Sequence, residues 1–178
     1  MSEVLTPKKN ALNHGVILGL MLALSTTIMY AFNTELFLKW WVGIASILLT
    51  VVMGVISTAK SKGILGGYIS FKQAFSSYFI TCAIGLAIST LVGILIFSIV
   101  DPDLGQYLNE RSMEIAREFM ERFGTPQEEI DKVMAEAATK DNFSVANQTK
   151  SYISFIIFQA VIGLLIGLIF KKKDPTLI

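Results

Sequence analysis

The side chains that could do chemistry are few in this sequence and are not grouped. His14 is the single histidine of the 178-residue chain, and no acid or nucleophile can be placed beside it from the sequence. General acid–base catalysis needs such a partner within hydrogen-bond reach. The serines of the apolar stretches likewise lack a base that could activate one of them as a nucleophile. We therefore predict no catalytic residues and no enzymatic activity, and expect His14 to face solvent or the membrane interface.

The sequence also gives no pattern for a metal or cofactor site. Cys82 is the single cysteine and lies in an apolar stretch, so it has no partner for a disulfide or a cysteine-based metal site. We interpret it as a small packing residue. The acids of residues 101–150 alternate with Arg and Lys at helical spacing, which indicates a solvated helix face. No basic surface with interleaved aromatic residues indicates nucleic-acid binding. We predict no metal, no cofactor and no nucleic acid.

The elements that must position these residues are helices that cross a membrane. The chain is 53% hydrophobic, and four stretches contain no Asp, Glu, Lys or Arg: residues 10–34, 40–59, 73–100 and 151–170. A hydrocarbon core of about 30 Å needs roughly 20 helical residues, and a stretch of this length is too long for a strand. The predicted fold class is all-α, an integral membrane four-helix bundle with spans at about 11–33, 40–59, 74–100 and 150–170.

The basic residues predict how the spans are oriented. Eight of the fifteen Lys and Arg residues precede the first span, lie between spans two and three, or follow the fourth span. The other side has a short loop with Glu35 and Lys39, and a segment from 101 to 150 with eleven acids and six bases. Lys and Arg near span ends favour the cytoplasm. We expect both termini to be cytoplasmic, the first span to be an uncleaved anchor, and Trp40 and Trp41 to lie at the outer interface.

Small residues recur at every fourth position along each span. Such stripes let helix backbones approach closely in lipid, so we expect close crossings along them. The interface could equally lie between two copies of the chain, which leaves a homo-oligomer open. Gln159 is expected to hydrogen-bond inside the bundle, with a ligand contact as the alternative. The two longest stripes are Ala11, Gly15, Gly19, Ala23, Thr27 and Ala31 in the first span, and Ser77, Thr81, Gly85, Ser89 and Gly93 in the third.

The spans themselves carry no signal for coupled transport. No acid, Lys or Arg lies in the middle of a span, although proton relays and ion coupling normally use such groups. No proline interrupts a span, so broken helices around a midplane substrate site are not indicated.

Residues 101–149 are predicted to form an extracytoplasmic helical insertion, an amphipathic hairpin between spans three and four. The third span is expected to end at Val100-Asp101-Pro102-Asp103, with Asp103 capping the helix that follows. Gly124 is expected to end that helix, and Thr125 to cap a second helix with Pro126 at its first position. The apolar faces could pack on each other and on the span ends, or on a membrane or periplasmic protein partner. Those faces comprise Leu108, Ile115, Ala116, Phe119, Met120 and Phe123, then Ile130, Val133, Met134 and Ala137.

The loop before the third span carries a recognisable pattern. Gly66 and Gly67 are followed by Tyr68-Ile69-Ser70-Phe71-Lys72-Gln73-Ala74-Phe75, a hydrophobic span that closes on Val100-Asp101-Pro102, and an acidic helical stretch. Over nearly the whole chain, this order resembles a domain-of-unknown-function family of small uncharacterised bacterial four-helix inner-membrane proteins. The resemblance implies a Gram-negative inner-membrane location. It brings no assigned activity and no catalytic residues.

These observations leave the molecular function unknown and favour one hypothesis. Residues 1–178 are expected to form a single membrane domain whose surroundings are the lipid bilayer. Because residues 101–149 are far longer than a link between two spans requires, we expect them to contact a partner. The favoured function is a non-catalytic accessory or scaffold subunit of a bacterial inner-membrane assembly. The alternative is an oligomeric channel or small-solute transport protein.

Overall fold

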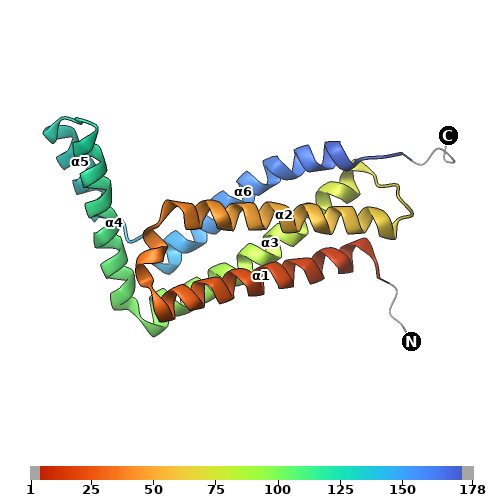
Figure 1. Cartoon of the computed structure of the whole chain (residues 1–178), viewed down its shortest axis with the longest axis horizontal. Coiled ribbons are helices and arrows are strands. Elements are labelled where there is room, and N and C mark those ends of the chain that lie inside the picture. The colour runs from red at the N-terminus through yellow and green to blue at the C-terminus, as the bar shows by residue number, and fades with distance from the viewer. Residues whose placement is uncertain (1–4, 174–178) are drawn as a thin grey trace.

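The computed structural model describes residues 5–173 as an all-α chain. Four helices are long and apolar enough to cross a membrane: α1 (Pro7–Phe32), α2 (Trp40–Ile64), α3 (Phe71–Ile94) with its extension η2 (Leu95–Val100), and α6 (Val145–Phe170). A short 3₁₀ turn, η1 (Thr34–Leu38), joins α1 to α2. Two further helices, α4 (Pro102–Arg122) and α5 (Gln127–Ala138), stand across one end of the bundle (Figure 1). The predicted all-α membrane bundle is confirmed.

Three of the long helices, α1, α3 and α6, begin at side-chain caps, and the long helices extend beyond the predicted spans. Thr6 accepts a hydrogen bond from the Lys9 N–H, so α1 starts at Pro7, four residues before the apolar stretch. Ser70 and Gln73 each bond the other's backbone N–H in a capping box at the start of α3, which the sequence analysis missed. A helix can continue through charged residues outside lipid, and α2 accordingly runs to Ile64.

α3 is the central helix and packs against α1, α2 and α6. Its closest approach is to α1, where glycines on both helices accept side chains from the other. A methyl group placed on Gly85 would lie 2.5 Å from the Leu18 side chain, and one on Gly19 would lie 2.7 Å from Ile88. At these distances, only the hydrogen of a glycine fits between the two helices. The predicted small-residue stripe therefore forms a close crossing within one chain.

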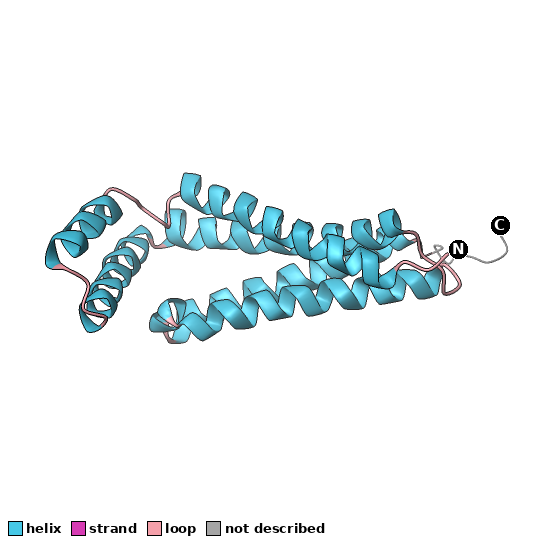
Figure 2. Ribbon diagram, turned by 90° about the horizontal axis from the view of Figure 1, so that it is seen from above, coloured by secondary structure: helices cyan, strands magenta, loops and turns pink. Residues whose placement is uncertain are grey.

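The basic end of the bundle ties α2, α6 and the loop before α3 together. Ile69 and Lys172 exchange two backbone hydrogen bonds of 3.1 and 2.9 Å, and the Lys62 ammonium donates to the Phe170 carbonyl at 3.1 Å. Over their whole length, α2 and α6 approach each other less closely than the other neighbouring pairs of long helices. Figure 2 shows the long helices splaying apart toward the end that carries the two shorter helices.

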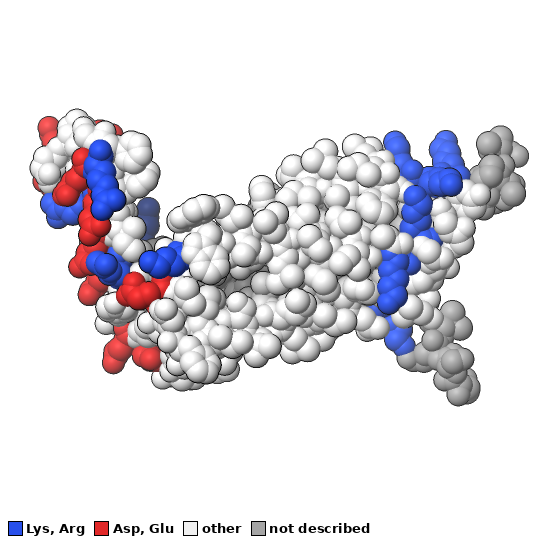
Figure 3. Space-filling model, in the orientation of Figure 1, with Lys and Arg blue, Asp and Glu red and all other residues white. Residues whose placement is uncertain are grey.

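Charged side chains occupy the two ends of the molecule. Figure 3 shows Lys and Arg in a belt around the end where the described chain begins and finishes, and a body between the ends that is white on this face. Acidic and basic side chains together cover much of the helical pair at the opposite end. This distribution matches four apolar helices that cross a bilayer with charged groups on both sides.

We call α4 and α5 together the arm (residues 102–138), and its two helix starts differ from the prediction. Asp101, and not Asp103, caps α4, because Pro102 takes the first helical position and the Leu104 N–H donates to the Asp101 carboxylate at 3.0 Å. Pro126 stays extended and occupies the cap position of α5, so Thr125 makes no cap. Gly124 ends α4 with a φ of +71°, as predicted.

Candidate functional site

A buried hydrogen-bond network joins α1, α2 and α3 in the basic half of the bundle. The Asn10 amide donates to the Ser57 carbonyl and to the Ser61 hydroxyl, both at 2.9 Å. The Thr81 hydroxyl lies 2.8 Å from that of Ser57 and 3.1 Å from the Ala11 carbonyl. Within residues 5–173, no fully buried side-chain nitrogen or oxygen lacks a partner. Because the network is satisfied internally, it fixes how the helices pack and offers nothing to a ligand.

Two residues that drew attention in the sequence lie inside this half of the bundle. His14 is buried, with Nδ1 2.8 Å from the Asn10 carbonyl of its own helix, so the expectation that it faces solvent or the interface is wrong. The reason is the early start of α1, which places His14 two turns inside the helix on the face that packs against α2 and α3. Cys82 is a fully buried free thiol on α3. In the described chain, no three His, Cys, Asp or Glu residues are grouped to hold a metal.

Tyr78 fills the centre of the bundle between three helices. Its ring occupies the space left by two glycines, since a methyl group would lie 2.6 Å from the ring on Gly54 of α2 and 3.0 Å on Gly163 of α6. Its hydroxyl donates to the Gln159 side-chain oxygen at 2.7 Å, and both side chains are buried. The predicted hydrogen bond of Gln159 inside the bundle is confirmed. Tyr78 thus closes the middle of the bundle.

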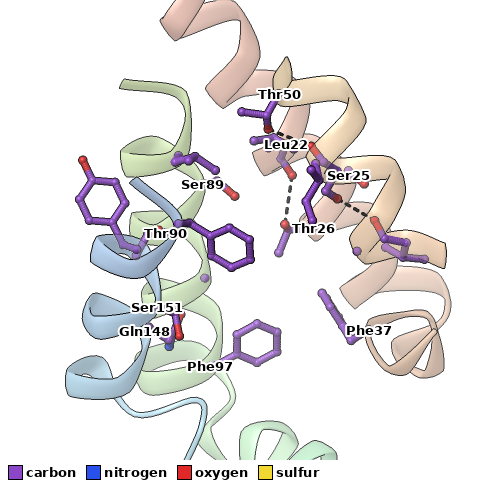
Figure 4. A pocket seen from close by; sticks show the side chains of 18 of the residues that line it. Leu22, Ser25, Thr26, Phe37, Thr50, Ser89, Thr90, Phe97, Gln148 and Ser151 are labelled. Carbon is purple, nitrogen blue, oxygen red and sulfur yellow. Dashed lines mark hydrogen bonds between the residues drawn. The ribbon is translucent and has the colours of Figure 1, made fainter. Parts of the chain in front are cut away.

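A cleft of about 390 Å³ opens above this closure, in the half of the bundle nearer the arm. Figure 4 shows its lining side chains pointing into the space between α1 and α2 on one side and α3 and α6 on the other. Hydroxyl and amide residues share the lining with Leu22 and several aromatic rings, and no Asp, Glu, Lys or Arg is among them. The hydroxyls of Thr26 and Thr50 donate to carbonyls of their own helices, so they are already hydrogen-bonded. The lining is therefore uncharged and largely apolar.

The cleft has the depth of one bilayer leaflet. Along α6 its lining runs from Gln148, near the arm, to Gln159 at the floor, where Thr50 closes the opposite side. At about 1.5 Å per residue, these eleven helical steps amount to roughly 16 Å. The hydrocarbon region of a bilayer is about 30 Å thick, so half of it is about 15 Å. The floor therefore lies near the middle of the membrane.

A second cavity of about 260 Å³ continues the cleft toward the arm. It shares Asn142, Ser151 and Phe155 with the cleft, and it adds Lys140 and Lys150. Lys150 donates to the Asn147 side chain at 3.4 Å, whereas the Lys140 ammonium makes no hydrogen bond or ion pair in the described part of the chain. The two cavities together run from a pair of lysines to an uncharged floor.

The base of the arm is fixed to the bundle by aromatic and polar contacts. Phe97, on the π-helical turn η2, packs against Phe37 and Phe143 with ring centroids 5.2 and 4.8 Å apart. On α4, the Tyr107 hydroxyl donates to the Glu35 carboxylate at 2.7 Å. This hydrogen bond to a negative group raises the pKa of Tyr107 above its ordinary value. The first half of α4 is therefore bound to the bundle.

The outer half of the arm leaves large apolar side chains uncovered. Leu108 and Ile130 are buried, but Phe119 and Phe123 on α4 are 61% and 75% exposed. Their rings pack on each other with centroids 4.5 Å apart. Ile115 and Val133 are also exposed, so we call these four residues the apolar face of the arm. The expected apolar faces are thus buried in part and exposed in part.

The comparisons with known proteins support the resemblance found in the sequence. The model of a family described as "Protein of unknown function (DUF4199)" matches residues 13–172. The chain belongs to this family. No curated protein and no solved structure matches the chain. Membership brings no assigned function, so the site has to be interpreted from its own geometry.

The sequence predicted the close crossings along the small-residue stripes and the hydrogen bond of Gln159, but it did not predict the cleft. The cleft arises where α2 diverges from α6, and no periodicity in either helix encodes that divergence. Tyr78 was also missed, because its role depends on glycines from two other helices. One usable signal was the density of hydroxyl residues in the arm-side halves of spans one and three, at Ser25, Thr26, Ser89 and Thr90.

Proposed function

We propose that this protein is a non-catalytic accessory or scaffold subunit of a bacterial inner-membrane assembly, which it contacts through the apolar face of its arm. The exposure of Phe119 and Phe123 is the observation that carries this proposal. Exposed apolar patches on an otherwise charged surface commonly mark protein interaction sites. Aromatic residues are also the side chains that most often supply binding energy at such sites.

The same proposal includes the orientation of the chain. The belt of Lys and Arg at the end of the bundle opposite the arm supports a cytoplasmic location for that end. The acidic arm then lies on the periplasmic side, with Trp40 and Trp41, which are 78% and 51% exposed, at the outer interface. A partner would therefore be a membrane or periplasmic protein.

An oligomeric channel or small-solute transport protein is the second candidate. The uncharged cleft favours it, because such a cleft could admit a small solute. Within one chain, however, the cleft ends at Thr50 and Gln159, and Tyr78 fills the space between Gly54 and Gly163 beyond them. A continuous path would have to form between copies of the chain.

The test compares two double variants of α4 in quantitative co-purification from native membranes in mild detergent. Phe119→Ser with Phe123→Ser removes the exposed rings, and Glu118→Ser with Arg122→Ser removes two exposed charged side chains of the same helix. Loss of two exposed aromatic contacts should reduce recovery of the partner about tenfold or more. The charged-residue control should recover the same partner at the wild-type level.

Recovery of no partner, or equal recovery with both variants, would count against the scaffold. Reconstitution into liposomes separates the two candidates. A scaffold leaves ion and solute flux at the level of empty liposomes, whereas flux that depends on the protein supports the channel or transport protein.

A further inference from the structure

We infer that the cleft and the adjoining cavity form one binding site for a phospholipid of the leaflet on the arm side. One acyl chain lies in the cleft, and the headgroup phosphate lies at Lys140 and Lys150. This site is separate from the apolar face of the arm and does not depend on the function proposed above.

The position and depth of the cleft fit an acyl chain. It lies between membrane-spanning helices, and from Lys150 to the floor at Gln159 it runs nine helical steps, about 14 Å, close to one leaflet of the hydrocarbon core, about 15 Å. The lining carries no charged side chain, so a charged group could not be accommodated at the floor without a large desolvation penalty. Leu22, Leu86, Phe97 and Phe155 supply apolar surface along its length.

The side of the cleft between α2 and α6 gives a lipid a route of access. These two helices are the least closely packed neighbours of the bundle, whereas α1 and α3 are locked together at Gly15, Gly19 and Gly85. Gly43 lines the cleft on α2, and a methyl group placed there would meet no atom within 4 Å. Ser151 and Phe155 line it on α6 and are exposed. A chain can therefore enter sideways from the bilayer.

The two lysines stand where the headgroup of such a lipid would lie. Lys140 and Lys150 line the cavity that shares three residues with the cleft. Lys140 lies between the arm and α6, and Lys150 lies near the start of α6. They belong to a segment with eleven acids and six bases, so a cavity with two lysines and no acid stands apart from its surroundings. Asn147 and Ser151 add hydrogen-bonding groups beside them. Ammonium and amide groups are suitable donors to phosphate and ester oxygens.

The experiment uses the full-length protein in vesicles that contain a photoreactive phospholipid. Phosphatidylglycerol and phosphatidylcholine, each with a diazirine in one acyl chain, are compared at equal amounts. Labelled positions are mapped by peptide mass spectrometry. We expect adducts on Leu22, Leu86 and Phe97 inside the cleft, in addition to adducts on outward-facing residues such as Leu48. We also expect the anionic lipid to label the cleft more strongly.

Two sets of variants separate the chain from the headgroup. Gly43→Leu fills the mouth of the cleft and should reduce cleft adducts of both lipids about fivefold or more, since a filled cavity excludes a ligand. Gly63→Leu is the matched control, because it places the same side chain in open space at the other end of α2. Ser151→Leu repeats the block from α6, so the test does not depend on the folding of one variant.

The headgroup contact is tested by Lys140→Gln with Lys150→Gln. It should lower cleft labelling by phosphatidylglycerol about tenfold and leave phosphatidylcholine almost unchanged, since each lysine adds electrostatic attraction to an anionic lipid. Lys39→Gln with Lys132→Gln removes the same charge from exposed positions outside both cavities. Adducts confined to outward-facing residues, or cleft labelling that Gly43→Leu and Ser151→Leu leave unchanged, would overturn the site. Equal effects of the two lysine pairs would overturn the headgroup assignment.

Discussion

At Gly85 the absence of a side chain is what allows α3 and α1 to touch. Leu18 of α1 occupies the space where a Cβ of Gly85 would lie. In the same way, Ile84 and Ile88 of α3 pack into the space left by Gly15 and Gly19 of α1. In lipid there is no hydrophobic gain from pairing two apolar helices, so close van der Waals contact provides much of the stability. The glycines of the stripe are therefore packing residues first.

Gly85→Val is expected to destabilise the bundle by about 1–3 kcal/mol, the usual range for overpacking a tight interior. The added side chain would clash with Leu18, which is fully buried and cannot move aside. Reversible unfolding in mixed micelles measures the effect. Gly63→Val is the control because a Cβ placed on Gly63 meets no atom within 4 Å. Equal stabilities of the two variants would show that the seam on α1 and α3 is not tightly packed.

The junction between α3 and α4 determines how the arm leaves the bundle. The π-helical turn η2 ends in a hydrogen bond from the Asp101 N–H to the Ile96 carbonyl, and the Asp101 side chain then starts α4. The Tyr30 hydroxyl of α1 lies 3.4 Å from the same carboxylate. One residue thus ends a membrane helix, begins the arm and contacts a neighbouring helix.

Asp101→Ala should destabilise the start of α4 by about 1 kcal/mol, the usual effect of losing an N-cap. Hydrogen exchange at the Leu104 amide, which the cap now protects, should accelerate accordingly. Asp103→Ala is the matched control, because Asp103 lies two residues away and its side chain makes no hydrogen bond within the described chain. The control loses only a favourable charge near the helix start, worth a few tenths of a kcal/mol. Faster exchange in the Asp103 variant than in the Asp101 variant would contradict the assignment.

The elements show where sequence reasoning succeeds and where it stops. Charge-free stretches locate the long helices, because lipid excludes charge from any span, and a spacing of four locates the faces that pack. Gly124 was assigned correctly since a positive φ favours glycine wherever it occurs. The caps at Asp103 and Thr125 were not, because each residue is directly next to a proline that sets the start of the helix. The cleft needs the angle between α2 and α6, which depends on all four helices.

At the scale of the whole molecule, the proposed orientation makes a prediction about chemical access. In intact cells whose outer membrane has been made permeable, a membrane-impermeant maleimide should label Glu128→Cys on the arm. It should label Lys60→Cys only after the inner membrane is opened, since Lys60 is exposed near the end of α2, two residues before the Lys62 that contacts Phe170. Cys82 is fully buried, so the native chain, which carries this cysteine, should not be labelled and serves as the negative control. The reverse labelling pattern would show that the chain has the opposite orientation in the membrane, although the packing of the helices would be unchanged.

The two backbone hydrogen bonds between Ile69 and Lys172 have a mechanical consequence. Together with the Lys62 contact to Phe170, they hold α2 and α6 together at the basic end. Because the two helices are held together at one end, the distance between them changes most at the other end. Any ligand that widens or narrows the cleft therefore moves the starts of these helices, and η1 and residues 139–144 connect those starts to the base of the arm.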